Sequence, residues 1–432
     1  MPLLHKVLKL FFLIVFIVIT FTPYSAIGDY QTEVTPRLVI GQEYDDNIDL
    51  EHKSEKSDFI TTASPGITIN TESTKTGLSL DYAPTWARYW DYEENNTVRH
   101  NGRINLWHLF TKYLRLNLEE SYQKSEMPYE GGGDGASQTV RHTRDTYERN
   151  NASISLDYQF GSQDHIKGGY MHQILDNEDP TLSDSVEHGP FASLFYWFDI
   201  NNGVELNSRF SKAEYELESG LPSEDDFSGH QSNARYIYRF DPRTKAYIYY
   251  GLTRRNFKID NNDYRIHDFS LGLDHGFSPL TSISLAVGLY KPKGDVYESE
   301  DPKLFSSAEF RHETENLKMN LGVEKGWDEG LFEAERRGFT EFWSSRGSIE
   351  YQSTEHLNAR AAISYRANNF RLGREDEQIY QGECGLRISF LRWYSLDLGY
   401  THTSCLSDDL DVEYIDNRVM LTLSASRAFQ WK

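Results

Sequence analysis

The chain has 432 residues and carries a formal net charge of −22 at pH 7. This acidic balance disfavours nucleic acid as a partner, because a polyanion is repelled by a protein surface of the same sign. A mean hydropathy of −0.63 argues against a bundle of transmembrane helices, whereas a membrane-spanning β-barrel needs apolar side chains on only one face of each strand.

The N-terminus has the pattern of a signal peptide. Lys6 and Lys9 precede an apolar run over residues 10–21, which is too short to cross a bilayer that requires about 20 residues. Small residues at Ala26 and Gly28 indicate cleavage after Gly28. We predict a signal peptide over residues 1–28 and a single β-barrel domain over residues 29–432. A retained membrane anchor is the alternative for the first segment.

Beyond this segment, apolar and polar side chains alternate in one stretch after another. Leu114, Leu116 and Leu118 share one face of a predicted strand, while Arg115 and Glu119 lie on the other face. A soluble β-sandwich also alternates, but its apolar face must cover a core. A long series of strands with arginine on the polar face fits lipid outside and water with ion pairs inside.

Aromatic residues close many of these stretches at intervals of about 40 residues, and a short turn follows each of them. Transmembrane barrels carry such aromatics as a girdle at the membrane interface. The predicted girdle comprises Phe110, Phe160, Phe198, Phe240, Phe277, Phe390 and Phe429. Two strands per interval predict a single antiparallel transmembrane barrel of about 20 strands, with about 18 as the alternative.

The connections between the predicted strands fall into two classes. Short turns are expected near residues 72–75, 111–113, 161–164, 199–202, 241–244, 278–281, 314–316, 353–356 and 391–393. The longer loops between them all contain acidic residues. Short turns belong in the periplasm and long loops outside, which places the barrel in the outer membrane of a Gram-negative bacterium. The acidic loops either bind divalent cations or are simply solvated, and solvation is the simpler interpretation.

The polar face of the strands is expected to line the lumen. The candidate lumen-lining residues are Arg103, Arg115, Arg149, Arg209, Arg235, Arg346, Arg360, Arg387, Glu119, Glu205, Glu350 and Glu383. Barrels of this size usually enclose water. Two interpretations remain open: a wall that guides a charged or hydroxyl-rich solute, and a ladder of ion pairs that only stiffens the barrel.

Nothing in the sequence predicts catalysis, a cofactor or a metal site. The 14 histidines are scattered, and the Gly-x-Ser-x-Gly elbow of a lipase is missing. If a turn is centred near Arg392, Cys384 pairs with Tyr400. Cys405 then lies about 17 Å further along, too far for a disulfide. We expect two free thiols, with Cys384 on the lipid-facing side and Cys405 at the start of an outer loop.

The first predicted hairpins carry residues that point to a family. Tyr44, Asp45, Asp46 and Asn47 close the first strand, and the sequence over residues 58–67 opens the second. This segment resembles the porin-like outer-membrane β-barrel proteins associated with exosortase, PEP-CTERM and exopolysaccharide loci. The resemblance implies a channel or scaffold in the export of a surface polysaccharide, with the polysaccharide or other export components as partners. It supplies no catalytic residues.

The C-terminal segment has the features that the barrel assembly machinery recognises. Val419, Leu421 and Leu423 alternate toward the aromatic Phe429, but Arg427 interrupts the pattern. We therefore expect this machinery and outer-membrane lipid as partners. The sequence predicts a porin-like conduit for saccharides or other polar solutes. The alternative is a structural or adhesive barrel whose acidic loops bind partners, cations or surface polymer.

Overall fold

The structure is a computed structural model that describes residues 30–127, 144–179, 182–216, 226–258, 263–294, 301–329, 339–370, 376–407 and 412–431. The signal peptide expected over residues 1–28 lies outside the described residues and stays a prediction. No helix among the described residues is long and apolar enough to cross a membrane.

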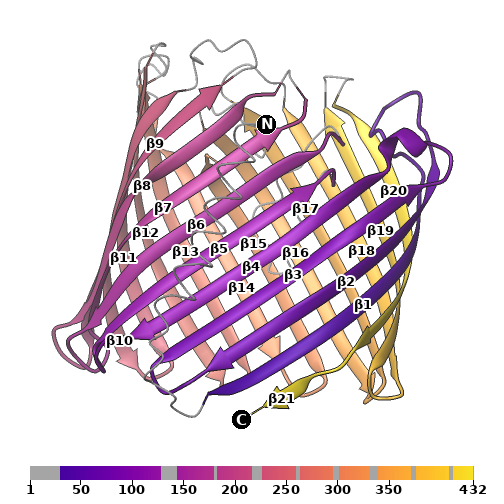
Figure 1. Ribbon diagram of the computed structural model, residues 1–432. Helices are drawn as coiled ribbons and strands as arrows, with labels where there is room; N and C mark the ends of the chain where they lie inside the picture. Colours follow the sequence, from indigo (N-terminus) through magenta and orange to yellow (C-terminus); the bar gives the residue numbers. More distant parts are fainter. Residues whose placement is uncertain are drawn as a thin grey trace.

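The described chain forms one closed antiparallel sheet, in which β1 to β20 each pair with their neighbours in sequence, β1 pairs with β20, and β21 pairs with β1 (Figure 1). A single 3-10 turn, η1 (Glu93–Asn95), lies between β3 and β4. The strands are β1 (Gln31–Asp45), β2 (Asp58–Glu72), β3 (Thr76–Tyr89), β4 (Thr97–Leu109), β5 (Leu114–Ser125), β6 (Tyr147–Gln159), β7 (His165–Asn177), β8 (Asp184–Trp197), β9 (Asn202–Glu216), β10 (Phe227–Asp241), β11 (Thr244–Phe257), β12 (Tyr264–Ser278), β13 (Thr281–Gly294), β14 (Lys303–Glu313), β15 (Leu317–Asp328), β16 (Thr340–Thr354), β17 (Leu357–Phe370), β18 (Glu377–Phe390), β19 (Tyr394–Ser407), β20 (Tyr414–Ser426) and β21 (Phe429–Trp431). The predicted barrel of about 20 strands is confirmed, and β21 is a short addition.

All nine predicted short turns join consecutive strands at one end of the barrel. Local side chains hold several of them. The Asp199 carboxylate accepts hydrogen bonds from the backbone N–H groups of Asn201 and Asn202, at 2.7 and 2.8 Å. At the last of these turns, Leu391 and Arg392 have φ values of 49° and 63°. Positive φ values are uncommon for residues other than glycine, and here they occur in a tight three-residue loop between Phe390 and Tyr394.

The start of β1 and the whole of β21 lie side by side at the short-turn end of the barrel. There Val34 pairs with Phe429, and Thr32 pairs with Trp431. The strand ends that the longer connections join all lie at the opposite end (Figure 1). Short turns and chain ends mark the periplasmic side of such barrels. The long loops are therefore extracellular.

The alternation of side chains separates an apolar outer face from a polar inner face. On β6, Ile154 and Leu156 are 47% and 46% exposed on the outside of the barrel. The seven candidate girdle phenylalanines are all exposed, from 37% for Phe390 to 61% for Phe198, and they lie at the periplasmic ends of the strands. Their interfacial role stays a prediction.

The C-terminal strand is interrupted where the sequence indicated. After Ser426 the ladder breaks at Arg427 and Ala428, and β21 resumes opposite β1 in the same register. The Arg427 N–H still donates to the carbonyl of Pro36, at 3.3 Å. Its guanidinium lies over the Trp393 and Phe429 rings, 4.5 and 4.9 Å from their centroids.

The two cysteines are free thiols, as predicted, and Cys384 pairs with Tyr400. Cys384 is exposed. The expectation for Cys405 was wrong, because this residue lies within β19 rather than in an outer loop. It is fully buried against Leu50, Ile379 and Tyr414. Strand β19 continues to Ser407, beyond the last residue of its lipid-facing apolar row. Its inward-facing side chains at this end pack on residues of neighbouring segments, which the sequence alone does not indicate.

Candidate functional site

The inner face is identified by contacts that pass over intervening strands. Trp327 on β15 donates from Nε1 to the Asp268 carboxylate on β12, at 2.7 Å, across β13 and β14. Arg255 on β11 binds Glu329, which follows β15, with Nε–Oε1 and Nη2–Oε2 distances of 2.8 and 2.5 Å. Side chains this far apart in the sheet converge only on its concave side, so these residues face the lumen.

All twelve candidate lumen residues share this inward register. Several lie in ion pairs or polar contacts along the wall. Arg235 pairs with Glu205 at 3.3 Å, and Arg360 and Arg387 share Asp397 at 3.4 and 2.7 Å. The remaining wall contacts are Arg209 with Glu187 at 2.9 Å, Arg346 with Glu309 at 3.5 Å, Glu350 with Asn358 at 2.8 Å and Glu383 with Gln381 at 3.1 Å.

The other four candidates have different surroundings. Arg115 lies over the Trp107 ring, 5.0 Å from its centroid. Arg149 is half-buried on β6, in register with Gln123 and Leu175. Arg103 and Glu119, together with Arg209, line a cavity of about 750 Å³ on the inside of β4 to β10. Other polar side chains contribute to its wall, among them Asn105, Gln173, Asn207 and Asn233, and so do the apolar side chains of Met171 and Phe191.

At the extracellular end the inner face changes character. Inward residues there are buried, and the apolar and aromatic ones form four clusters that the sequence did not reveal. Ile48 and Leu50, from the loop after β1, pack on inward residues of the strands, as does Phe339, which precedes β16. These loop residues therefore lie against the inner side of the barrel wall at this end. We call this packed rim the mouth.

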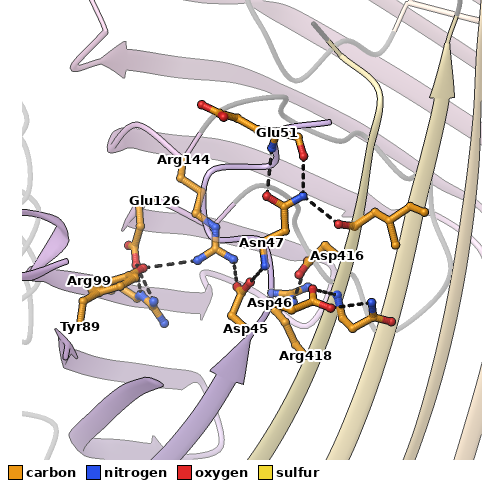
Figure 2. Close-up of polar contacts among 12 residues, drawn as sticks. Asp45, Asp46, Asn47, Glu51, Tyr89, Arg99, Glu126, Arg144, Asp416 and Arg418 are labelled. Atoms are coloured by element: carbon orange, nitrogen blue, oxygen red, sulfur yellow. Dashed lines mark hydrogen bonds and ion pairs between the residues drawn. The ribbon is translucent and has the colours of Figure 1, made fainter. Parts of the chain in front are cut away.

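A chain of buried polar contacts crosses the mouth (Figure 2). Arg144, which precedes β6, forms an ion pair with Asp45 at the end of β1. The same guanidinium lies 3.4 Å from the Tyr89 hydroxyl, which donates to Glu126 at 3.2 Å. Arg99 on β4 donates from Nε to that Glu126 at 2.8 Å. The network thus links β1, β3, β4 and the segments flanking the loop between β5 and β6.

Arg144 remains charged in this setting. Burial opposes its charge, but the carboxylate of Asp45 and the Tyr89 hydroxyl favour it, and the net effect raises the pKa of the guanidinium. A buried cation that loses its anionic partner is strongly destabilising. The ion pair with Asp45 therefore holds the segment before β6 against the mouth.

The candidate family motif lies at the closure of the barrel (Figure 2). The side-chain amide of Asn47 donates to the carbonyls of Glu51 and Ile415, at 2.9 and 2.8 Å, and its oxygen accepts from the Glu51 N–H at 3.0 Å. Asp46 accepts two hydrogen bonds from Asn417 on β20, at 2.7 and 2.8 Å. Tyr44 is 38% exposed on the outer face. The motif thus fastens the first long loop to the last long strand.

Three carboxylates of this region lie close enough to surround a cation, since single oxygens of Asp45, Asp46 and Asp416 fall within 4.8 Å of one another. Asp45 and Asp46 accept hydrogen bonds from other groups, whereas Asp416 has a nearby guanidinium but no hydrogen-bond partner among the described residues. Asp45 accepts from Asn47 and pairs with Arg144, Asp46 is bound by Asn417, and Asp416 lies 3.1 Å from Arg418 Nε. A divalent ion would compete with two buried guanidinium groups. We assign the carboxylates to the ion-pair network rather than to a metal centre.

A second buried network occupies the opposite part of the mouth. Glu329 accepts from both Arg255 and the Tyr264 hydroxyl, the latter at 2.5 Å. Arg366 on β17 binds Asp328 at 2.5 Å and lies over the Phe342 ring, 4.2 Å from its centroid. Arg255 and Arg366 are not among the predicted lumen residues, although each has the same parity as the inward residues of its strand. Their long-range partners depend on how the loops fold inward, which the alternation does not reveal.

Comparison with known proteins supports this architecture. Residues 22–179, which are less than half of the chain, match the family model described as "Putative beta-barrel porin 2". No curated protein sequence matches the chain. The matches therefore describe the class of the protein rather than a particular relative.

Several solved outer-membrane proteins share the fold. The copper transporter OprC is 9% identical, covering 93% of this chain and 81% of its own, with a TM-score of 0.51. OpdK from Pseudomonas aeruginosa is 11% identical over 93% of this chain and 99% of its own, with a TM-score of 0.44. OccAB4 from Acinetobacter baumannii is 12% identical over 94% of this chain and 100% of its own, with a TM-score of 0.46.

At these identities the likeness concerns the fold alone. Together with the family model and the closed barrel, it defines the class: the protein is an outer-membrane β-barrel of the porin-like kind. None of these matches bears on an association with exosortase or exopolysaccharide loci.

Proposed function

We propose that the barrel is a conduit for polar solutes, saccharides among them, and that the packed mouth limits what passes. The observation that carries this proposal is the cavity of about 750 Å³ on the inner wall, which charged and amide side chains share with Met171 and Phe191. Arg103, Glu119 and Arg209 contribute charge to it, while asparagine and glutamine side chains supply both donors and acceptors. A hydroxyl-rich solute exchanges hydrogen bonds with such a wall as it loses those to water.

The mixed charge of the wall favours weak binding at successive points. Cationic groups such as Arg360 and Arg387 share one carboxylate, Asp397, so that they retain donors for a passing solute. Conduction requires binding that is favourable enough for entry and weak enough for release. A wall that carries both positive and negative side chains binds a passing solute more weakly at each point than a wall of one charge sign does.

Passage of a polysaccharide chain is the more demanding form of the proposal, and it rests on the family resemblance. The mouth is the obstacle, because Ile48, Leu50 and Phe339 are buried against the strands at the extracellular end. Export of a polymer would require these loop residues to move outward. Passage of a small saccharide or another small polar solute would require less movement of these loop residues.

One observation favours a second candidate, the structural or adhesive barrel. Buried ion pairs join the loops to the strands at two places in the mouth, through Arg144 with Asp45 and Arg255 with Glu329. Loops held in this way would present a fixed extracellular surface. In this candidate the charged lumen solvates and stiffens the barrel.

Single-channel recording in a planar bilayer separates the two candidates. The conduit should show stable conductance steps, and neutral or charged oligosaccharides added to one side should block them. In a salt gradient, the R103Q/R209Q variant should shift the reversal potential toward cation preference, because two positive charges leave the wall. Arg243→Gln, which removes one exposed charge from a periplasmic turn, is the control. A folded barrel that conducts nothing supports the scaffold instead.

A further inference from the structure

The outer surface carries a basic row that the lumen argument does not use. Across four adjacent strands, directly opposed outward residues are His230 on β10, Arg254 on β11, Arg265 on β12 and Lys293 on β13. One step closer to the periplasm, His267 pairs with Lys291. All six side chains point away from the lumen, because the intervening residues Arg255, Tyr264 and Ile266 are buried on the inner side. We call these six residues the basic rim.

The basic rim lies at the extracellular border of the lipid-facing surface. Toward the periplasm, the same faces of β11, β12 and β13 present Tyr250, Phe269 and Leu289, which are directly opposed and exposed. Apolar side chains at this position contact acyl chains. The basic residues just beyond them are therefore at the level of the lipid headgroups.

Like charges held directly opposite each other across strands destabilise a sheet. Arg254 faces Arg265, and Arg265 faces Lys293, so the row places three cations side by side in a chain whose net charge is −22. Arg254, Arg265 and Lys293 are all exposed. An arrangement of this kind is stable when an anion lies between the cations.

The described carboxylates nearby are engaged elsewhere. Glu214 pairs with Lys212 at 2.6 Å, and Asp226 pairs with Lys258 at 2.8 Å. Asp263, which precedes Arg265 on the same face, accepts the backbone N–H of Phe257 at 2.7 Å. The described ion pairs do not include Arg254, Arg265 or Lys293. Arg254 instead donates to the side chain of Asn256, at 2.9 Å.

We propose that the basic rim binds a phosphorylated glycolipid of the outer leaflet, with its phosphates between Arg254, Arg265 and Lys293 and its acyl chains against Tyr250, Phe269 and Leu289. The arginine forks suit phosphate geometry, and the lysine adds a point charge. The aromatic and leucine side chains extend the contact into the acyl region. This surface is independent of the proposed conduit, because it lies on the opposite face of the sheet.

The test uses the full barrel in phosphatidylcholine nanodiscs, titrated with diphosphoryl lipid A, with bound lipid counted by native mass spectrometry. The R254Q/R265Q/K293Q variant should lose affinity by at least about tenfold, since each basic residue near an anionic headgroup contributes substantially. The matched control is K75Q/K112Q/R243Q, which removes three exposed charges from periplasmic turns. The control should bind as the wild type does. Heat-modifiable migration on gels shows that both variants are folded.

Two further ligands distinguish the contribution of the acyl chains to binding from that of the phosphates. Dephosphorylated lipid A should bind the wild type and the rim variant equally weakly. Inorganic pyrophosphate should not displace diphosphoryl lipid A, because it lacks the acyl contacts. The proposal is overturned if the rim variant retains wild-type affinity for diphosphoryl lipid A, or if pyrophosphate alone binds as tightly as the lipid does.

Discussion

At the scale of single residues, Asn47 connects the loop after β1 to the start of β20 through its side-chain amide. Its fully buried amide satisfies three backbone groups, at Glu51 and Ile415. Replacing it with alanine leaves those groups without partners. We expect Asn47→Ala to lower the free energy of unfolding by about 2–4 kcal/mol, since each unsatisfied buried group costs about 1–3 kcal/mol. Urea unfolding in detergent micelles measures this. Asn101→Ala, at an exposed position, should leave stability nearly unchanged, and equal losses would contradict the role given to Asn47.

The assignment of alternate side chains to the lipid and to the lumen can also be tested with single substitutions. Ile154 is exposed on the lipid side of β6, and its neighbour Ser153 lines the cavity on the inner wall. Ile154→Arg should reduce the folding free energy by about 2–4 kcal/mol, as a charge near the bilayer midplane does. Ser153→Arg should be tolerated, because the arginine remains in water. Folding equilibria into lipid vesicles provide the measurement. Similar costs for both variants would mean that the facing is assigned incorrectly.

At the scale of the element, β21 extends the pairing with β1 after a break in the ladder. Phe429 and Trp431 pair with Val34 and Thr32, and their rings stack with centroids 6.2 Å apart. Deleting residues 429–432 should reduce the yield of assembled barrel, because the terminal aromatic strand is lost. The measurement is the fraction of protein that keeps heat-resistant migration after expression. Gln430→Ala, which keeps the backbone pairing, is the control, and an undiminished yield from the deletion would count against β21 as an assembly signal.

At the scale of the whole molecule, the periodic features of the sequence predict the fold well. Strand number, turn positions and the pairing of Cys384 with Tyr400 all follow from alternation and spacing, since a strand repeats every two residues whatever its surroundings. The mouth does not follow in the same way. Tyr147 and Tyr264 occupy inward positions but are buried among apolar residues, which include Phe339 from the segment before β16 in the case of Tyr264. The pairing of Arg144 with Asp45 depends on how the loops pack. Loop packing leaves no periodic pattern in the sequence, so it cannot be predicted from alternation.

The proposed limit on passage at the mouth can be tested through Arg144, which pairs with Asp45 there. Arg144→Ala leaves Asp45 buried without its cation, a change that costs about 3–5 kcal/mol in comparable pairs. The cost falls on the mouth rather than on the ladder, so we expect an intact barrel whose inward segments loosen and whose single-channel conductance rises. Arg88→Ala is the matched control, because Arg88 is 63% exposed near the same end of β3 and its pair with Glu93 spans 3.9 Å. If conductance is the same in both variants, the Arg144 network does not restrict the lumen, and the narrowest point lies deeper along the wall.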